Sequence, residues 1–286
     1  MKLASFRLGE SRSYGALAGG GIVDLGARHG RLWPDLLSVL RHGALDRLRE
    51  LATGLGPDHS FADVVLQPPV PSPGRILCVG LNYRSHIEET GRQLPAYPTL
   101  FTRFPDSHVG HGEAIVRPRL SRQHDFEGEL AVVIGRRGRH VQRDAALGHV
   151  AGYSCYNDGS IRDYQAHTSQ FTAGKNFWRS GAFGPWLVTC DEIPDPGELR
   201  LQTRLNGEVM QMAPTRDLLF DVPALIEYIS GIFPLRPGDV ISTGTTGGVG
   251  KARNPPVFLK PGDRIEIEIS RIGTLSNVVE DEPATA

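Results

Sequence analysis

Two glutamates, Glu127 and Glu129, stand at the start of an apolar run that extends to residue 135. On a β-strand, residues two apart point to the same face, so both carboxylates would share one side of it. Paired acids beside a core are costly unless a cation neutralises them, and oxygen ligands favour a hard dication such as Mg2+ or Mn2+. Asp158 follows another apolar segment and supplies a third candidate oxygen ligand. The alternative is a solvated strand end for the glutamates and a simple turn around Asp158.

Three carboxylates around one dication leave a negative site, which would repel a substrate that is itself a carboxylate. Nearby cations are therefore needed, and Lys175 and Arg162 are the candidates. Helical spacing over residues 158–165 predicts that Asp158, Arg162 and Gln165 share one face. Each cation taken alone also fits an ordinary solvated surface charge.

His86 and Glu89 lie three residues apart in a segment that follows a predicted strand and a glycine. On a helical turn the two become neighbours, and a histidine polarised by a carboxylate is a general base that activates water near neutral pH. The alternative is a surface helix that carries an incidental histidine and glutamate.

The glycine-rich stretch 243–251 does not fit a nucleotide-binding P-loop. That motif needs glycine where Thr245 stands and serine or threonine where Ala252 stands. The prolines that follow cannot open a helix to receive a phosphate. Such a loop instead allows backbone amides and a threonine hydroxyl to approach a carboxylate.

A proline-rich stretch divides the chain into two parts, which together must position these residues. Four prolines between residues 67 and 74 exclude both a helix and a central strand. Before them, short strands are predicted near residues 3–7, 14–18 and 21–25, and leucines recur at helical spacing between residues 36 and 51. We therefore predict a small N-terminal α+β domain over residues 1–70 and a catalytic domain over residues 71–286.

The second part is predicted to be rich in strands. Apolar or alternating runs occupy residues 75–80, 130–135, 186–189, 199–205, 239–242 and 264–269. Asn206-Gly207 predicts a hairpin turn, and residues 222–232 predict an amphipathic helix. The expected fold class is α+β, with a β-rich catalytic domain of mixed connections.

The composition argues against nucleic acid or a membrane as the binding partner and favours a small molecule. The 286 residues include 31 basic and 32 acidic side chains, and the net charge of -1 offers no attraction for nucleic acid or an anionic membrane. Three cysteines are too few for a disulfide framework, which favours a reducing compartment. Arg7 and Glu10 interrupt any signal peptide, and no apolar run approaches the roughly 20 residues of a membrane span. We expect a cytoplasmic protein that acts on a small molecule.

Six motifs in chain order resemble the fumarylacetoacetate hydrolase family. They are GLNYRSHIEE at 80–89, DFEGELAVVIG at 125–135, YND at 156–158, GK at 174–175, RPGDV at 236–240 and TGT at 243–245. The combination is far more specific than any one motif. The segment before residue 70 resembles the small accessory domain of many bacterial members.

The resemblance implies mixed sheets rolled around the active site, a homodimer, and one Mg2+ or Mn2+ per subunit, held by Glu127, Glu129 and Asp158. It implies that His86 and Glu89 form a water-activating dyad on a mobile lid and that Lys175 is catalytic beside the metal. The positions that match substrate-binding residues are Tyr83, Arg162, Gln165, Gly244 and Thr245. Trp178 and Thr246 stand where many members have aspartate and proline, which predicts a different pocket wall.

The reaction we expect first is hydrolysis of a carbon–carbon bond in a 2,4-dioxo acid of the acylpyruvate or fumarylpyruvate type. The products would be pyruvate or a related 2-oxo acid and a carboxylic acid. The alternative is a lyase or isomerase of a 2-oxo acid, such as a decarboxylase, hydratase or dehydratase, on the same metal-enolate platform. The least favoured interpretation is a non-catalytic module with a structural cation, because catalysis needs open metal positions.

Overall fold

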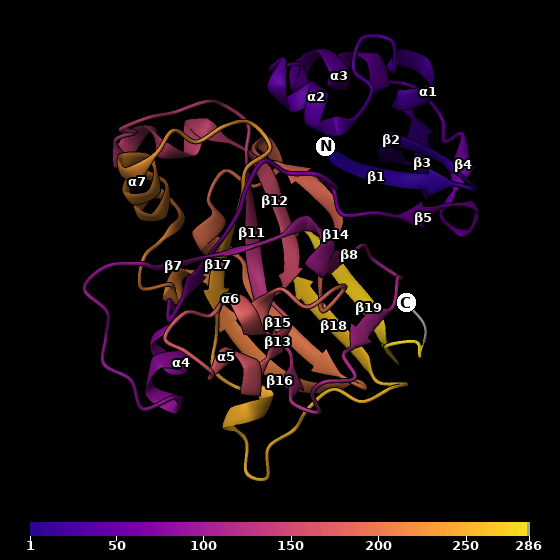
Figure 1. Ribbon diagram of the computed structural model, residues 1–286. Coiled ribbons are helices and arrows are strands. Elements are labelled where there is room, and N and C mark those ends of the chain that lie inside the picture. Colours follow the sequence, from indigo (N-terminus) through magenta and orange to yellow (C-terminus); the bar gives the residue numbers. More distant parts are fainter. Residues whose placement is uncertain (285–286) are drawn as a thin grey trace.

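The structure is a computed structural model that describes residues 1–284. A mixed sheet of 12 strands runs through it (Figure 1). In spatial order its main path is β4 (His59–Ser60), β3 (Gly21–Asp24), β2 (Ser11–Ala18), β1 (Lys2–Leu8), β14 (Gly181–Thr189), β12 (Val150–Asn157), β11 (Gly128–Ile134), β17 (Val240–Thr245), β6 (Ile76–Gly80) and β7 (Thr99–Arg103). Off this path, β5 (Val65–Leu66) pairs with β1 and β8 (His108–Val109) pairs with β14.

A second sheet has five strands and packs against the first. Its spatial order is β16 (Glu208–Pro214), β15 (Arg200–Leu205), β18 (Arg264–Ile269), β19 (Gly273–Asp281) and β9 (Ile115–Arg117). The predicted hairpin joins β15 to β16, and Asn206 and Gly207 both have the positive φ that its turn requires. A two-stranded ribbon of β10 (His124–Asp125) and β13 (Ser160–Ile161) completes the sheets. The predicted α+β class with mixed sheets is confirmed.

Strand β11 shows why its sequence is apolar without interruption. Leu130, Val132 and Ile134 point into the core between the two sheets. Ala131 and Val133 point to the other face, into the core that also contains leucines of the N-terminal helices. A strand buried on both faces needs apolar residues at every position rather than at alternate ones. The strand that leads to the candidate ligands is therefore held from both sides.

Short helices accompany these sheets. They are α1 (Leu25–His29), α2 (Leu36–Arg41), α3 (Leu45–Ala52), α4 (Arg84–Glu89), α5 (Arg162–Gln165), α6 (Thr172–Lys175) and α7 (Val222–Ile232). The leucine-rich stretch forms two helices rather than one, with Gly43 at a positive φ between them. The helix expected over residues 158–165 starts only at Arg162, because Ser160 and Ile161 pair with β10.

The N-terminal strands continue the large sheet through the pairing of β1 with β14. Figure 1 shows this N-terminal part, in indigo, at one side of the molecule. The domain boundary at residue 70 stays a prediction. Over residues 1–284, no helix is both long and apolar enough to span a membrane.

Candidate active site

The candidate site lies at one end of three neighbouring strands, β12, β11 and β17. Glu127 directly precedes β11, Glu129 is its second residue, and Asp158 directly follows β12. The two strands pair with Gly128 opposite Asn157, and the Asp158 amide donates to the Glu127 carbonyl at 2.9 Å. Antiparallel pairing therefore places Asp158 beside the glutamates.

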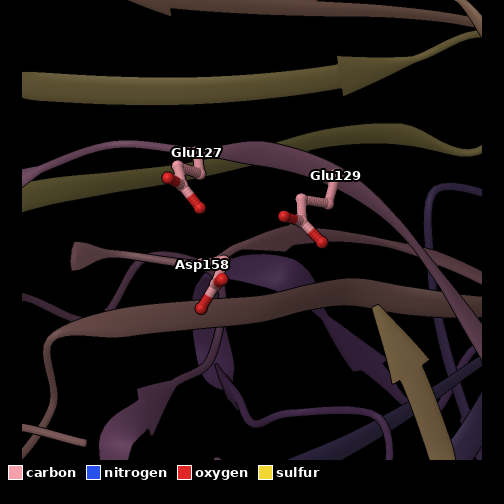
Figure 2. A group of neighbouring side chains, drawn as sticks. All are labelled: Glu127, Glu129 and Asp158. Carbon is pink, nitrogen blue, oxygen red and sulfur yellow. The ribbon is translucent and has the colours of Figure 1, made fainter. Parts of the chain in front are cut away.

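The three predicted metal ligands converge. Glu127, Glu129 and Asp158 are 5%, 2% and 0% exposed, and each offers an oxygen within 4.8 Å of the others. Figure 2 shows the three carboxylates directed toward a shared space. Buried oxygen donors at this spacing fit a hard divalent cation better than a soft one. The solvated strand end considered above is excluded by this burial.

Cations already neutralise two of the carboxylates. Lys175 at the end of α6 places Nζ 2.6 Å from Glu127 Oε2 and 2.6 Å from Asp158 Oδ2. Burial by itself would raise the pKa of Glu127, but the charges of Lys175 and Arg162 outweigh burial and lower that pKa.

Glu129 has a different environment. Its Oε2 accepts from Ser242 Oγ and from the Gly244 amide, and it forms no ion pair within residues 1–284. Burial and the charges of Asp158 and Glu127 raise its pKa well above the usual range. A dication bound here would favour the ionised form of Glu129. The donor set thus fits a divalent cation.

Beside the carboxylates lies a cavity of about 830 Å³. The three ligands line it together with six other predicted site residues, which are His86, Glu89, Arg162, Gln165, Lys175 and Thr245. They come from α4, α5, α6 and the end of β17, so segments far apart in the sequence meet here (Figure 1). The cavity offers positions for a substrate next to the metal ligands.

His86 and Glu89 are in direct contact on α4, with Nδ1 of the histidine 2.7 Å from Oε1 of the glutamate. Glu89 Oε2 also accepts from the Gly248 amide at 2.7 Å, and Ser85 Oγ lies 3.2 Å from Thr246 Oγ1. These contacts hold α4 against the glycine-rich loop. Over the described residues His86 Nε2 has no hydrogen-bond partner, which leaves this atom free for chemistry.

Arg162 contacts Glu127 and shares the short helix α5 with Gln165. Arg162 Nη1 lies 2.7 Å from Glu127 Oε1 and donates to Gln165 Oε1 at 2.9 Å. Asp158 lies outside α5, so the predicted helical face is right for Arg162 and Gln165 and wrong for Asp158. Pairing of β10 with β13 places the start of α5 beside the segment between β10 and β11 that contains Glu127.

Four predicted residues lie elsewhere. Tyr83 is completely buried with Ala213 and Leu218, because it ends an extended segment and turns inward before α4. Gly244 donates to Glu129 and does not line the cavity. Trp178 is 52% exposed over Arg179, away from the cavity. Thr246 contacts α4 rather than the cavity wall.

Arg103 is a site residue that the sequence analysis missed. It is 2% exposed, and Nη1 donates to Asp158 Oδ1 at 2.6 Å and to the Gly159 carbonyl at 2.9 Å. Its other donors bond to Ser107 and Ser180. An arginine at a strand end has no pattern that marks it as buried, so no sequence signal pointed to it.

Gln211 is a second missed residue. Its Nε2 donates to Thr245 Oγ1 at 2.8 Å, and its Oε1 accepts from the Gly128 amide at 2.9 Å. Thr245 in turn donates to the Gly128 carbonyl at 3.0 Å. Strand β16 therefore fixes the hydroxyl that faces the cavity.

The chain is similar to known proteins over most of its length. The chain is 40% identical over 266 residues to a mitochondrial oxaloacetate tautomerase of Bos taurus, which covers 91% of this chain and 84% of that protein. It is 42% identical over 225 residues to the oxaloacetate tautomerase YisK of Bacillus subtilis, which covers 77% and 75% of the two chains.

The likeness extends to a solved structure that contains a metal. Maleylpyruvate hydrolase from Sphingobium sp. SYK-6, in complex with manganese(II) and pyruvate, matches with a TM-score of 0.82 and 31% identity. The match covers 99% of this chain and 100% of that one. In addition, residues 75–280 match the family model described as fumarylacetoacetate (FAA) hydrolase C-terminal. The chain belongs to the fumarylacetoacetate hydrolase family.

Proposed function

We propose that this protein is a divalent-metal-dependent isomerase that interconverts the keto and enol forms of a 2-oxo acid such as oxaloacetate. The observation that carries the proposal is the buried triad of Glu127, Glu129 and Asp158 in one cavity with the His86–Glu89 pair. The two tautomerases at 40% and 42% identity favour an isomerase over the hydrolase that we expected first.

The triad would hold Mg2+ or Mn2+. Such an ion, when bound, supplies a Lewis acid that stabilises negative charge developing on the C2 oxygen of the substrate. Lys175 and Arg162 keep their charge, because carboxylates beside them outweigh burial and raise both pKa values. These two cations bind and orient the substrate carboxylate rather than exchange protons.

His86 is the residue that moves the proton. Its Nδ1 is engaged by Glu89, so Nε2 receives the proton from C3 while the C–H electron pair forms the C2–C3 double bond. As that bond forms, the π pair of the C2 carbonyl moves onto its oxygen. The same nitrogen then delivers the proton to the C2 oxygen, which completes the enol. The proton count is balanced, and neither water nor a second reactant is consumed.

Hydrolysis of a 2,4-dioxo acid is the second candidate. The 2.7 Å contact between His86 and Glu89 also suits the activation of water, and maleylpyruvate hydrolase is among the similar structures. In this reaction the imidazole would deprotonate a water that attacks the C4 carbonyl. The cavity of about 830 Å³ is large enough for such a longer substrate.

Decay of enol oxaloacetate, followed by its ultraviolet absorbance, tests the first proposal. We expect metal-loaded protein to accelerate the decay above the buffer rate, and His86→Ala to lower that acceleration about 100-fold. No acceleration with either Mg2+ or Mn2+ would refute the isomerase. Release of pyruvate from acylpyruvates without tautomerisation would place the hydrolase first.

We also propose a homodimer, which rests on the family resemblance alone. Size-exclusion chromatography with light scattering tests it on the full chain. A mass of one subunit at micromolar concentration would refute the dimer.

A further inference from the structure

Asp125 is a completely buried carboxylate that neither lines the cavity nor belongs to the metal triad. Its Oδ1 accepts from the amides of Phe126 and Gly250, each at 2.8 Å. Its Oδ2 accepts from Arg162 Nε at 2.8 Å and from the Lys251 amide at 3.0 Å. Both oxygens are fully used inside the protein, so Asp125 is not available as a base or a ligand.

One of these partners, Arg162, stands between two carboxylates. Its Nε and Nη2 face Asp125 Oδ2, and its Nη1 faces Glu127 Oε1 at 2.7 Å. Without Asp125, the only carboxylate within residues 1–284 left to pair with this buried guanidinium would be Glu127, a metal ligand. Asp125 thus determines how the guanidinium is oriented.

The same arginine also faces the cavity. Arg162 is 5% exposed and lines the cavity, while its Nη2 is buried 2.8 Å from Asp125 Oδ2. A carboxylate is the best-matched partner of a guanidinium. The cavity-facing part of Arg162 therefore fits an anionic ligand.

The other partners of Asp125 belong to a different segment of the cavity lining. Lys251 and Ala252 of η7 (Gly250–Ala252) line the cavity, and Asp125 holds this turn through two backbone amides. The approach is close, because a Cβ added to Gly250 would lie 2.6 Å from Asp125 Oδ1 and 1.9 Å from the Val257 carbonyl. One carboxylate thus joins two walls of the cavity.

We propose that Asp125 is a positioning residue that sets the Arg162 guanidinium and the 250–252 turn in the geometry that binds the carboxylate of a 2-oxo acid. It acts through these groups and touches neither substrate nor metal. This inference rests on the proposed function in one respect, which is the choice of a 2-oxo acid as the class of ligand.

The test is oxalate binding to Mn2+-loaded protein, measured by titration calorimetry. Asp125→Asn keeps the shape but loses the charge, and one of its oxygens becomes an amide that clashes with an N–H donor. We expect oxalate to bind about 10- to 100-fold more weakly, as for one lost hydrogen bond to a charged group. With a turned-over 2-oxo acid, KM should rise more than kcat falls.

Asp163→Asn is the matched control. Asp163 is the next residue on α5 and accepts from Ser121 Oγ and the Tyr164 amide, but it does not line the cavity. Oxalate affinity of this variant should stay within about two-fold of the wild type, because the side chain contacts neither Arg162 nor the cavity.

A double-mutant cycle separates positioning from general damage. In the background of Arg162→Lys, Asp125→Asn should cause much less further loss of oxalate affinity, because the two residues act together. Additive losses, or wild-type oxalate affinity in folded Asp125→Asn, would overturn the proposal. If that variant does not fold, Asp125→Glu decides, since it keeps the charge but displaces it, and unchanged affinity would overturn the proposal.

Oxalate binding does not depend on turnover. A wild-type protein that binds oxalate but does not accelerate tautomerisation refutes the proposed reaction, and the Asp125 variants still report on positioning. The two assays therefore distinguish a failure of the proposed tautomerase activity from a failure of the proposed role of Asp125.

Discussion

Replacement of Lys175 by methionine tests the electrostatics of the carboxylate triad. The lysine is 2% exposed, contacts Glu127 and Asp158 at 2.6 Å each, and lies over the ring of Phe101. Methionine keeps most of the buried volume and the contact with this ring but removes the charge. The substitution therefore isolates the two ion pairs from packing.

The expected loss of stability follows from the burial of these pairs. Burial would lower the pKa of Lys175, but Asp158 and Glu127 outweigh it and raise that pKa, so a full charge is removed. Loss of one partner from a buried ion pair costs about 3–5 kcal/mol. At roughly 2–4 °C per kcal/mol for a chain of this size, Tm in EDTA should fall by about 6–20 °C.

A divalent cation should reverse this effect. It neutralises the carboxylates that lost the lysine, which keep only Arg162 and Arg103 as charged partners among residues 1–284. In the variant the cation also no longer meets a neighbouring ammonium. Scanning fluorimetry in EDTA and in Mn2+ should therefore show a larger metal-induced rise in Tm for Lys175→Met than for wild type. Lys260→Met, at an exposed position, is the control. An unchanged Tm in EDTA, or an equal or smaller rise with Mn2+, would refute this account of the site.

Three further predictions concern residues around the cavity. Glu89→Gln keeps the contact with His86 but removes its charge, so kcat should fall about 100-fold with little change in KM; kcat within about two-fold of wild type would contradict the dyad. Burial is the main cause that lowers the pKa of His124 from 6.5 to about 4. The folded protein therefore holds this histidine neutral, and the stability that is present above pH 6.5 is lost as pH falls toward 4. Urea denaturation should show a loss that approaches about 1.4 kcal/mol per pH unit across this window, and His124→Gln should remove it. Trp178→Ala should leave kcat/KM within about two-fold of wild type, because this side chain lies outside the cavity; a ten-fold loss in steady-state assays would show that the tryptophan shapes the site.

Local periodicity made much of the site predictable. The two-residue repeat of a strand placed Glu127 and Glu129 on one face, and the i, i+3 spacing of a helix placed Glu89 beside His86. The apolar run 130–135 indicated a buried strand, and Asn206-Gly207 indicated the hairpin between β15 and β16. These features depend on covalent geometry over a few residues, which the sequence displays directly.

Periodicity also failed at identifiable places. The spacing of Asp158, Arg162 and Gln165 fitted a helix, but pairing of Ser160 and Ile161 with β10 took the first part of that segment into a strand. A helical pattern over so few residues is weak, and a sheet partner distant in sequence overrides it.

The amino-acid sequence by itself determined which residue types were available, their local spacing, and the α+β class. Only the tertiary structure decided that β11 lies between β12 and β17, that Arg103 and Asp125 are buried beside the site, and that Tyr83 turns away from the cavity. The physical reason is that strand order and side-chain burial depend on packing energy summed over segments far apart in the chain. No local repeat encodes that sum.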